Sequence, residues 1–147
     1  MNFGRKTEHQ KAILALDKAV SDMVRAQFPD VCASCESTHP EYDCGHWIKR
    51  ERMATRFHPY NIYPQGLQEN RFEGGKEWEF GMGIDKRWGD GTCVFLKNLA
   101  EPKHGKGANP DEGWTTDELK QLRSAATKFG WNAYIALYRE LRPSHFP

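Results

Sequence analysis

The sequence predicts an α+β protein that is mostly helical, with a small β centre flanked by N- and C-terminal helices. Two observations predict the helices: apolar residues recur every three or four positions near both ends of the 147-residue chain, and a capping pattern precedes each of these stretches. A third observation predicts the β centre, because the irregular stretch 30–56 contains a short β-like piece. We expect a single domain over residues 1–147, with its central region at about 30–90.

The first helix is expected at residues 7–28. Thr7 and Gln10 have the spacing of a capping box, and Pro29 ends the helix. One face carries the apolar residues Ile13, Leu16, Val20, Met23 and Val24. Two short strands are expected next, at 46–48 and 61–63.

Proline cannot donate a hydrogen bond within a ladder, so the second strand is expected to stop at Pro64. A helix is then expected from Gln68 or Lys76 to Trp88, although its glycines lower its helix propensity. The remaining predictions are a turn at 89–91, an apolar helix at 93–100, a Pro/Gly/Lys-rich loop at 101–113, a helix that begins after the capping box at Thr115 and is closed by Gly130, and a last helix at 132–141 within a C-terminal helical region 92–142.

The composition restricts the partners and the compartment. The net charge is +1, so a nucleic-acid partner must be met by a local basic patch. No stretch is apolar enough to span a membrane, and the polar N-terminus lacks the apolar core of a signal peptide, so we expect a cytoplasmic protein that makes no membrane contact. In that reducing compartment the four cysteines, Cys32, Cys35, Cys44 and Cys93, favour metal binding or core packing over disulfides.

Three polar residues in the central region have the spacing of an HNH nuclease motif: His46, Asn61 and Asn70. The motif places a histidine on a first strand, where it accepts a proton from water and so generates the hydroxide that attacks a phosphodiester. The asparagine of the second strand braces the hairpin or orients the imidazole. The polar residue of the following helix binds one divalent cation, which neutralises charge on the phosphate.

The surrounding blocks resemble the phage recombination-protein NinG (Rap) family. They are Cys-Gly-His-Trp-Ile-Lys-Arg at 44–50, Ala-Thr-Arg-Phe at 54–57, Asn-Ile-Tyr-Pro-Gln at 61–65, Asn-Arg-Phe-Glu-Gly-Gly from 70, Trp-Gly-Asp-Gly at 88–91 and the upstream Cys-Ala-Ser-Cys at 32–35. The resemblance covers roughly residues 16–99. It implies a ββα-metal endonuclease that cuts DNA, in this family branched or partly single-stranded recombination intermediates, and hence the cytoplasm of a bacterial host if the gene is carried by a phage.

By this resemblance His46 is expected to be the general base, Asn61 the hairpin residue and Asn70 a ligand of a catalytic Mg²⁺ or Mn²⁺. Gly45 precedes the histidine where many HNH enzymes have a metal ligand, so Asp43 or Glu73 is a further candidate ligand. A homodimer would suit a two-fold DNA junction.

The chain departs from the family at a zinc site. Relatives carry a second cysteine pair, which here is replaced by Gly66 and Glu69. Cys32 and Cys35 alone cannot complete a tetrahedral zinc shell. Either the Zn²⁺ is lost, or Cys44 and a residue such as His39 or Glu69 substitute.

A competing interpretation gives zinc the set Cys32, Cys35, Cys44 and His46, which would remove His46 from catalysis.

Four basic residues beside His46 favour phosphate contacts: Lys49, Arg50, Arg52 and Arg56. Two functions other than a nuclease stay open. One is an inactive family member that binds DNA structures or inhibits a host process, and the other is a zinc-knuckle DNA-binding adaptor.

Overall fold

The computed structural model describes residues 4–35, 37–72, 74–101 and 113–147. In these ranges the protein is α+β and mostly helical, with one two-stranded antiparallel sheet, as the sequence predicts. None of the helices described in them is both long and apolar enough to cross a membrane.

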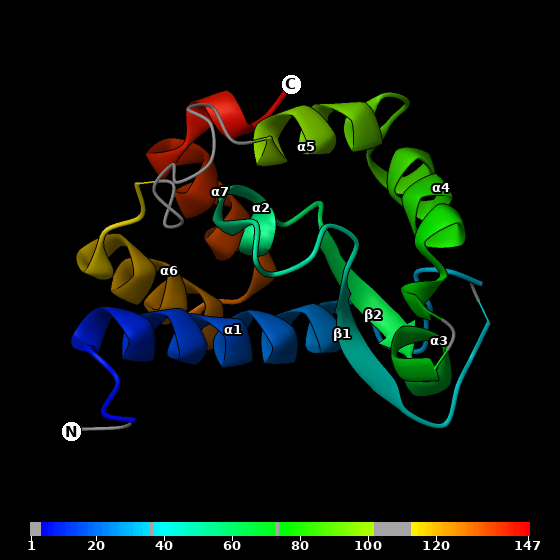
Figure 1. The fold of residues 1–147 in the computed structure, drawn as a ribbon, viewed down its shortest axis with the longest axis horizontal. Helices are drawn as coiled ribbons and strands as arrows, with labels where there is room; N and C mark the ends of the chain where they lie inside the picture. The colour runs from blue at the N-terminus through cyan, green and yellow to red at the C-terminus, as the bar shows by residue number, and fades with distance from the viewer. Residues whose placement is uncertain (1–3, 36, 73, 102–112) are drawn as a thin grey trace.

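The longest helix, α1 (Glu8–Gln27), organises the molecule. It begins where predicted, because the Thr7 hydroxyl accepts a hydrogen bond from the Gln10 amide while the Gln10 side chain accepts one from the Thr7 amide. Figure 1 shows α6 lying along the N-terminal part of α1 and the hairpin lying near its C-terminal end, with α3 packed on the hairpin. One helix therefore connects the C-terminal helices to the β centre.

The strands β1 (Tyr42–His46) and β2 (Ile62–Gly66) form the hairpin, with His46 opposite Ile62. The predicted strand limits were wrong, because the first strand ends at His46 and the second continues through Pro64. In a two-stranded sheet each strand has a free edge, so the missing N–H of Pro64 can face away from β1. On that outer side the Pro64 carbonyl accepts a hydrogen bond from the Ala33 amide at 2.7 Å.

The helix predicted up to Trp88 consists of two helices, α3 (Leu67–Phe72) and α4 (Glu77–Trp88). Between them lies the short 3₁₀ turn η1 (Gly74–Lys76), in which Gly74 and Gly75 have φ angles of 64° and 73°. Such positive φ angles end a right-handed helix. The chain therefore changes direction between α3 and α4, and α3 packs against both strands of the hairpin.

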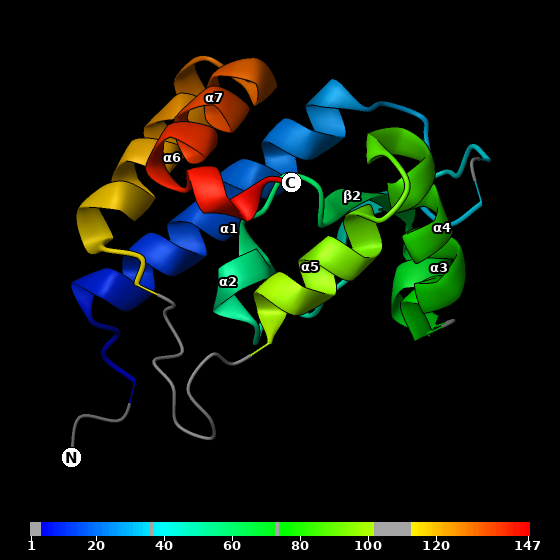
Figure 2. The ribbon, with the colours of Figure 1, turned by 90° about the horizontal axis from the view of Figure 1, so that it is seen from above.

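Three further helices complete the fold: α5 (Thr92–Ala100), α6 (Thr116–Lys128) and α7 (Trp131–Leu141), with the 3₁₀ turn η2 (Pro143–His145) after them. All three lie close to the predicted positions, and most of the predicted loop 101–113 lies outside the described residues. Figure 2 shows α5 crossing from α4 back toward α2 (Met53–Arg56).

The buried apolar residues form two clusters. The larger one joins α1, α6 and α7 to Phe57 and Ile62 beside the hairpin, and the smaller one packs α4 and α5 against Tyr63. The hairpin thus lies between two cores, and burial on both sides holds its backbone in place.

His58 is buried in the larger core and predicts a loss of stability in acid. Burial lowers the pKa of His58 from 6.5 to about 3, and its ring contacts the His145 carbonyl and the Tyr60 amide. Below pH 6.5 the unfolded chain binds a proton that the folded protein does not, so the free energy of unfolding decreases by about 1.4 kcal/mol per pH unit as the pH falls.

Urea unfolding tests this contribution in the wild type and in His58→Gln, which cannot titrate. From neutral pH down to about pH 5, the free energy of unfolding of the wild type is expected to decrease by about 2 kcal/mol more than that of the variant. Equal losses in both proteins would contradict the assignment.

Candidate functional site

A pocket of about 400 Å³ lies where α1 meets the hairpin and α3; we call it the hairpin pocket. Its lining consists of Asp17, Ser21, Arg25, Asp43, Cys44, His46, Arg50, Asn70 and Arg71. Two of the three HNH-spaced residues, His46 and Asn70, thus face the same space, although they lie 24 positions apart (70 − 46).

His46 ends β1 with its ring in a defined tautomer. Its Nε2 lies 3.0 Å from the Arg56 carbonyl oxygen, and a carbonyl can only accept, so Nε2 carries the hydrogen. In the neutral ring Nδ1 is then the proton acceptor. Burial lowers the pKa of His46 to about 4, which keeps the imidazole neutral near pH 7.

Asn61, immediately before β2, is fully buried and braces the loop between the strands. Its Oδ1 accepts a hydrogen bond from the Ile48 amide at 2.8 Å, and its Nδ2 donates to the carbonyls of Ile48 and Thr55 at 3.0 and 3.1 Å. Asn61 does not line the hairpin pocket. Of the two roles expected for it, bracing the hairpin agrees with these contacts.

Asn61→Ala is expected to lower the free energy of unfolding by about 3 kcal/mol, because it removes this partner from the buried Thr55 carbonyl and from the part-buried amide and carbonyl of Ile48. Urea unfolding gives the value. Asn132→Ala, on the exposed side of α7, is the matched control and is expected to change stability by less than about 0.5 kcal/mol. Similar losses in the two variants would contradict the bracing role.

Asn70, on α3, is joined to Asp43 of β1. The Asn70 amide donates to Asp43 Oδ2 at 2.9 Å, and Arg71 binds both Asp43 oxygens at 2.8 and 3.1 Å. Burial raises the pKa of Asp43, but the hydrogen bonds from Arg71 and Asn70 outweigh it and lower the pKa overall. The result is an ionised carboxylate beside an amide oxygen, which are ligand types that Mg²⁺ accepts. The other candidate ligand, Glu73, lies outside the described residues.

The four basic residues predicted to contact phosphate have different surroundings in the structure. Arg50 lines the hairpin pocket, and Lys49 and Arg52 are exposed beside it. Arg56 instead forms a half-buried ion pair with Asp17 of α1, with Nε and Oδ1 3.0 Å apart. Arg56 is therefore already engaged by a carboxylate in this structure.

Two arginines that sequence reasoning missed also line the hairpin pocket, Arg25 of α1 and Arg71 of α3. The position of Arg71 directly after Asn70 was the available signal for it. No local pattern pointed to Arg25, because only the packing of α1 against β1 brings it to the pocket.

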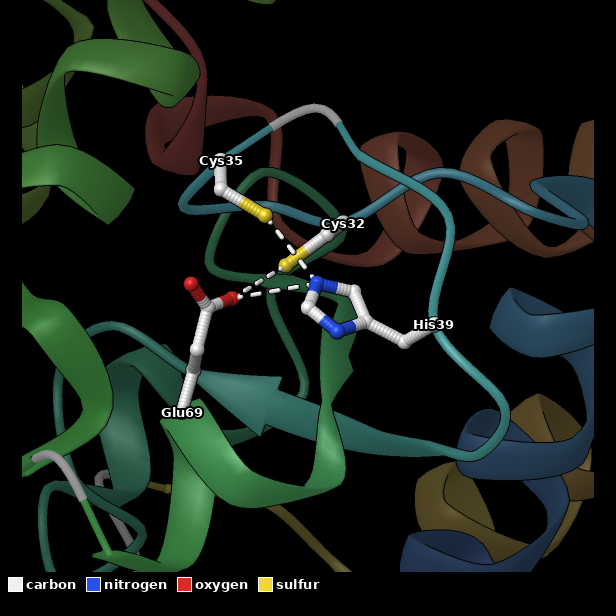
Figure 3. A group of neighbouring side chains, drawn as sticks. All are labelled: Cys32, Cys35, His39 and Glu69. Atoms are coloured by element: carbon white, nitrogen blue, oxygen red, sulfur yellow. Dashed lines mark hydrogen bonds and ion pairs between the residues drawn. The ribbon is translucent and has the colours of Figure 1, made fainter.

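A second group of side chains lies near the hairpin end occupied by Gly66. Cys32, Cys35, His39 and Glu69 each offer one ligand atom, and these four atoms lie within 4.8 Å of one another (Figure 3). Cys32 Sγ is 2.8 Å from Glu69 Oε2, and Cys35 Sγ is 3.0 Å from His39 Nε2. This cluster, which we call the Cys-His-Glu cluster, could hold a metal ion.

The geometry explains how the cluster forms without a second cysteine pair. A Cβ atom added to Gly66 would lie 2.7–2.8 Å from atoms of the His39 ring, so the imidazole fills the space that a side chain at position 66 would need. Glu69 stands at the other replaced position and reaches the same centre. The expected replacement was Cys44 together with a residue such as His39 or Glu69; the structure brings both His39 and Glu69 to the cysteine pair and leaves Cys44 outside the cluster.

Cys44 is not part of this cluster, and neither is His46. Cys44 lines the hairpin pocket, and burial raises the pKa of its thiol to about 12 despite a hydrogen bond with Ser21. The structure does not bring together the zinc set Cys32, Cys35, Cys44 and His46, because His39 lies at the Cys-x-x-Cys pair while β1 places Cys44 and His46 in the hairpin pocket. Cys93, by contrast, donates to the Gly81 carbonyl at 3.0 Å.

Neighbouring groups orient the ligands of the Cys-His-Glu cluster. The Gly66 amide donates to Cys32 Sγ, while Ser34 and Lys76 bind the two oxygens of Glu69 at 3.0 and 2.9 Å. Burial raises the pKa of Glu69, but its hydrogen bonds, that with Cys32 first, lower it to about 2. Support of this kind is typical of metal sites.

Comparison with known protein-family models, with curated proteins and with solved structures gives no match.

Proposed function

We propose that this protein is a metal-dependent DNA endonuclease of the HNH type. The observation that carries the proposal is the hairpin pocket, where the neutral His46, the joined Asp43 and Asn70, and three arginines line one space of about 400 Å³. These groups match the needs of phosphodiester hydrolysis: a base for water, oxygen ligands for a cation and positive charge for the phosphate. The family resemblance adds the preferred substrate, branched or partly single-stranded recombination intermediates.

In the proposed reaction His46 Nδ1 removes a proton from a water molecule, and the hydroxide attacks the phosphorus atom while the P–O bond to the leaving oxygen breaks. The Arg56 carbonyl holds the Nε2 hydrogen throughout, so the ring keeps one orientation as it becomes imidazolium. Asp43 and Asn70 would hold Mg²⁺ or Mn²⁺, which stabilises the leaving oxygen when bound. Arg25, Arg50 and Arg71 orient the phosphate.

We also propose that the Cys-His-Glu cluster holds a structural zinc. Two cysteines, an imidazole and a carboxylate are four ligands of the types zinc accepts, and their ligand atoms, all within 4.8 Å of one another, need only small shifts to reach the spacing of about 3.5 Å in a tetrahedral shell. Such an ion would join Cys32, Cys35 and His39, which precede β1, to Glu69 of α3. Its place outside the hairpin pocket leaves His46 available for catalysis.

One contact favours a second candidate function, an inactive member of the family that binds DNA structures or inhibits a host process. Both oxygens of Asp43 are bound by Arg71, and a catalytic cation would have to displace this side chain. Arg71 is more than half exposed, so the displacement costs little. The nuclease therefore remains the better-supported function.

Nicking of supercoiled plasmid and of a four-way DNA junction separates the two functions. We expect cleavage that requires added Mg²⁺ or Mn²⁺, and we expect Asn70→Ala to need a higher cation concentration. Junction binding without nicking under any metal condition would favour the inactive member and overturn the nuclease.

A further inference from the structure

A second pocket lies beside the hairpin pocket, on the same side of α1. It has a volume of about 560 Å³, and its lining includes Arg5, Lys6, Gln10, Leu14 and Arg56. Arg5 and Lys6 are exposed, and they precede the first turn of α1. The second pocket is therefore basic at its open end.

The two pockets share one wall. Arg56 lines the second pocket, Asp17 lines the hairpin pocket, and the two side chains form the half-buried ion pair. This pair neutralises the charge of Asp17. A phosphate chain that crosses from one pocket to the other therefore does not meet an unpaired Asp17 carboxylate at the wall.

One stripe of α1 connects the pockets. Gln10 and Leu14 line the second pocket, and Asp17, Ser21 and Arg25 line the hairpin pocket. Their spacings of four, three, four and four residues place all five on one face of the helix. Figure 1 shows α1 as a straight rod between the chain's N-terminal segment and the hairpin.

The stripe is basic at both ends. Arg5 and Lys6 lie at one end, and the arginines of the hairpin pocket lie at the other. Asp22, next to Ser21, is held between Lys18 and Arg25 at 2.7 and 2.8 Å, so this carboxylate is also paired with cations.

We propose that this stripe is the track for a DNA strand, which runs from the scissile phosphate in the hairpin pocket along α1 to Arg5 and Lys6. The proposal rests on the nuclease function and adds the direction and length of the substrate. Gln10 and Ser21 lie 11 residues apart on the helix, which corresponds to about 16 Å. Along the axis of a DNA duplex each strand has one phosphate about every 3.4 Å, so a duplex whose axis lies along α1 would place about five nucleotides of the strand on the track, on one side of the cut.

The test measures DNA binding without cleavage. All proteins carry His46→Ala, and the probes are a fluorescein-labelled four-way junction and a linear duplex of the same length, followed by anisotropy over a range of salt concentrations. The double variant Arg5→Ala/Lys6→Ala removes two predicted phosphate contacts. It is therefore expected to weaken binding and to reduce the slope of log affinity against log salt by about two.

The matched control is Lys120→Ala/Lys128→Ala, which removes two exposed charges from α6. It is expected to keep the slope of the parent protein. Equal slopes for the two double variants would overturn the track.

The proposed function can fail separately from the track. Wild-type nicking together with equal slopes for the two variants would reject the track alone. A slope reduced only by Arg5→Ala/Lys6→Ala, with no nicking by the wild type, would reject the nuclease alone. The absence of any DNA binding would reject both.

Discussion

Cys35→Ser is expected to lower the free energy of unfolding by at least about 3 kcal/mol and the melting temperature by about 10 °C. The physical reason is the loss of a ligand of the proposed structural zinc, since such an ion contributes on the order of 10 kcal/mol to small domains that fold around it. Here the two apolar cores remain, so the loss is smaller than that limit. Thermal unfolding followed by circular dichroism gives the shift.

The control for this prediction is Cys93→Ser. Its thiol donates to a backbone carbonyl, a contact that a hydroxyl can also make, so its melting temperature is expected to stay near that of the wild type. Metal analysis of wild type purified without chelator is expected to find one zinc per chain, and a chelator is expected to lower the melting temperature of the wild type to that of Cys35→Ser. The zinc site would be contradicted if the wild type contained no metal, had the same melting temperature as Cys93→Ser and were unaffected by the chelator.

His46→Ala is expected to reduce the rate of plasmid nicking by about 10²–10⁴-fold, which is the usual contribution of a general base. The ring also has a structural contact, because its Nε2 donates to the Arg56 carbonyl. His46→Gln separates the two roles, since a glutamine amide can donate to that carbonyl but cannot accept a proton at neutral pH.

We therefore expect His46→Gln to be as inactive as His46→Ala while it unfolds closer to the wild type. His9→Ala, whose ring contacts Thr116 between α1 and α6, is the matched control and is expected to keep the nicking rate. Nicking by His46→Gln at the wild-type rate would exclude His46 as the base.

Local patterns predicted α1, α5, α6 and α7, because each has signals within a few residues, whereas α2 lies in a stretch that was expected to be irregular. The capping boxes at Thr7 and Thr115 formed as predicted. The second strand extends past its predicted limit because the missing N–H of Pro64 is tolerated where the strand pairs on one side only. The break between α3 and α4 depended on positive φ angles at adjacent glycines, which weak helix propensity alone did not predict.

For the candidate site too, some features could be predicted from the sequence and others required the structure. The spacing of His46, Asn61 and Asn70 could be read along the chain, and the structure places the first two on the hairpin and the third on the helix that follows it. The sequence also predicted a metal-binding Cys-x-x-Cys pair and named His39 and Glu69 among its possible partners. Each of these predictions used residues close together or at a known spacing.

Only the tertiary structure decided which of these residues meet. It selected His39 and Glu69 over Cys44, because the imidazole fills the space beside Gly66 while β1 carries Cys44 toward α1. It also brought Arg25 to the hairpin pocket through helix packing. The sequence by itself thus determined the N- and C-terminal helices and the chemistry available. Three-dimensional packing decided which side chains form the Cys-His-Glu cluster and the basic lining of the hairpin pocket, because both join segments that are far apart in the chain.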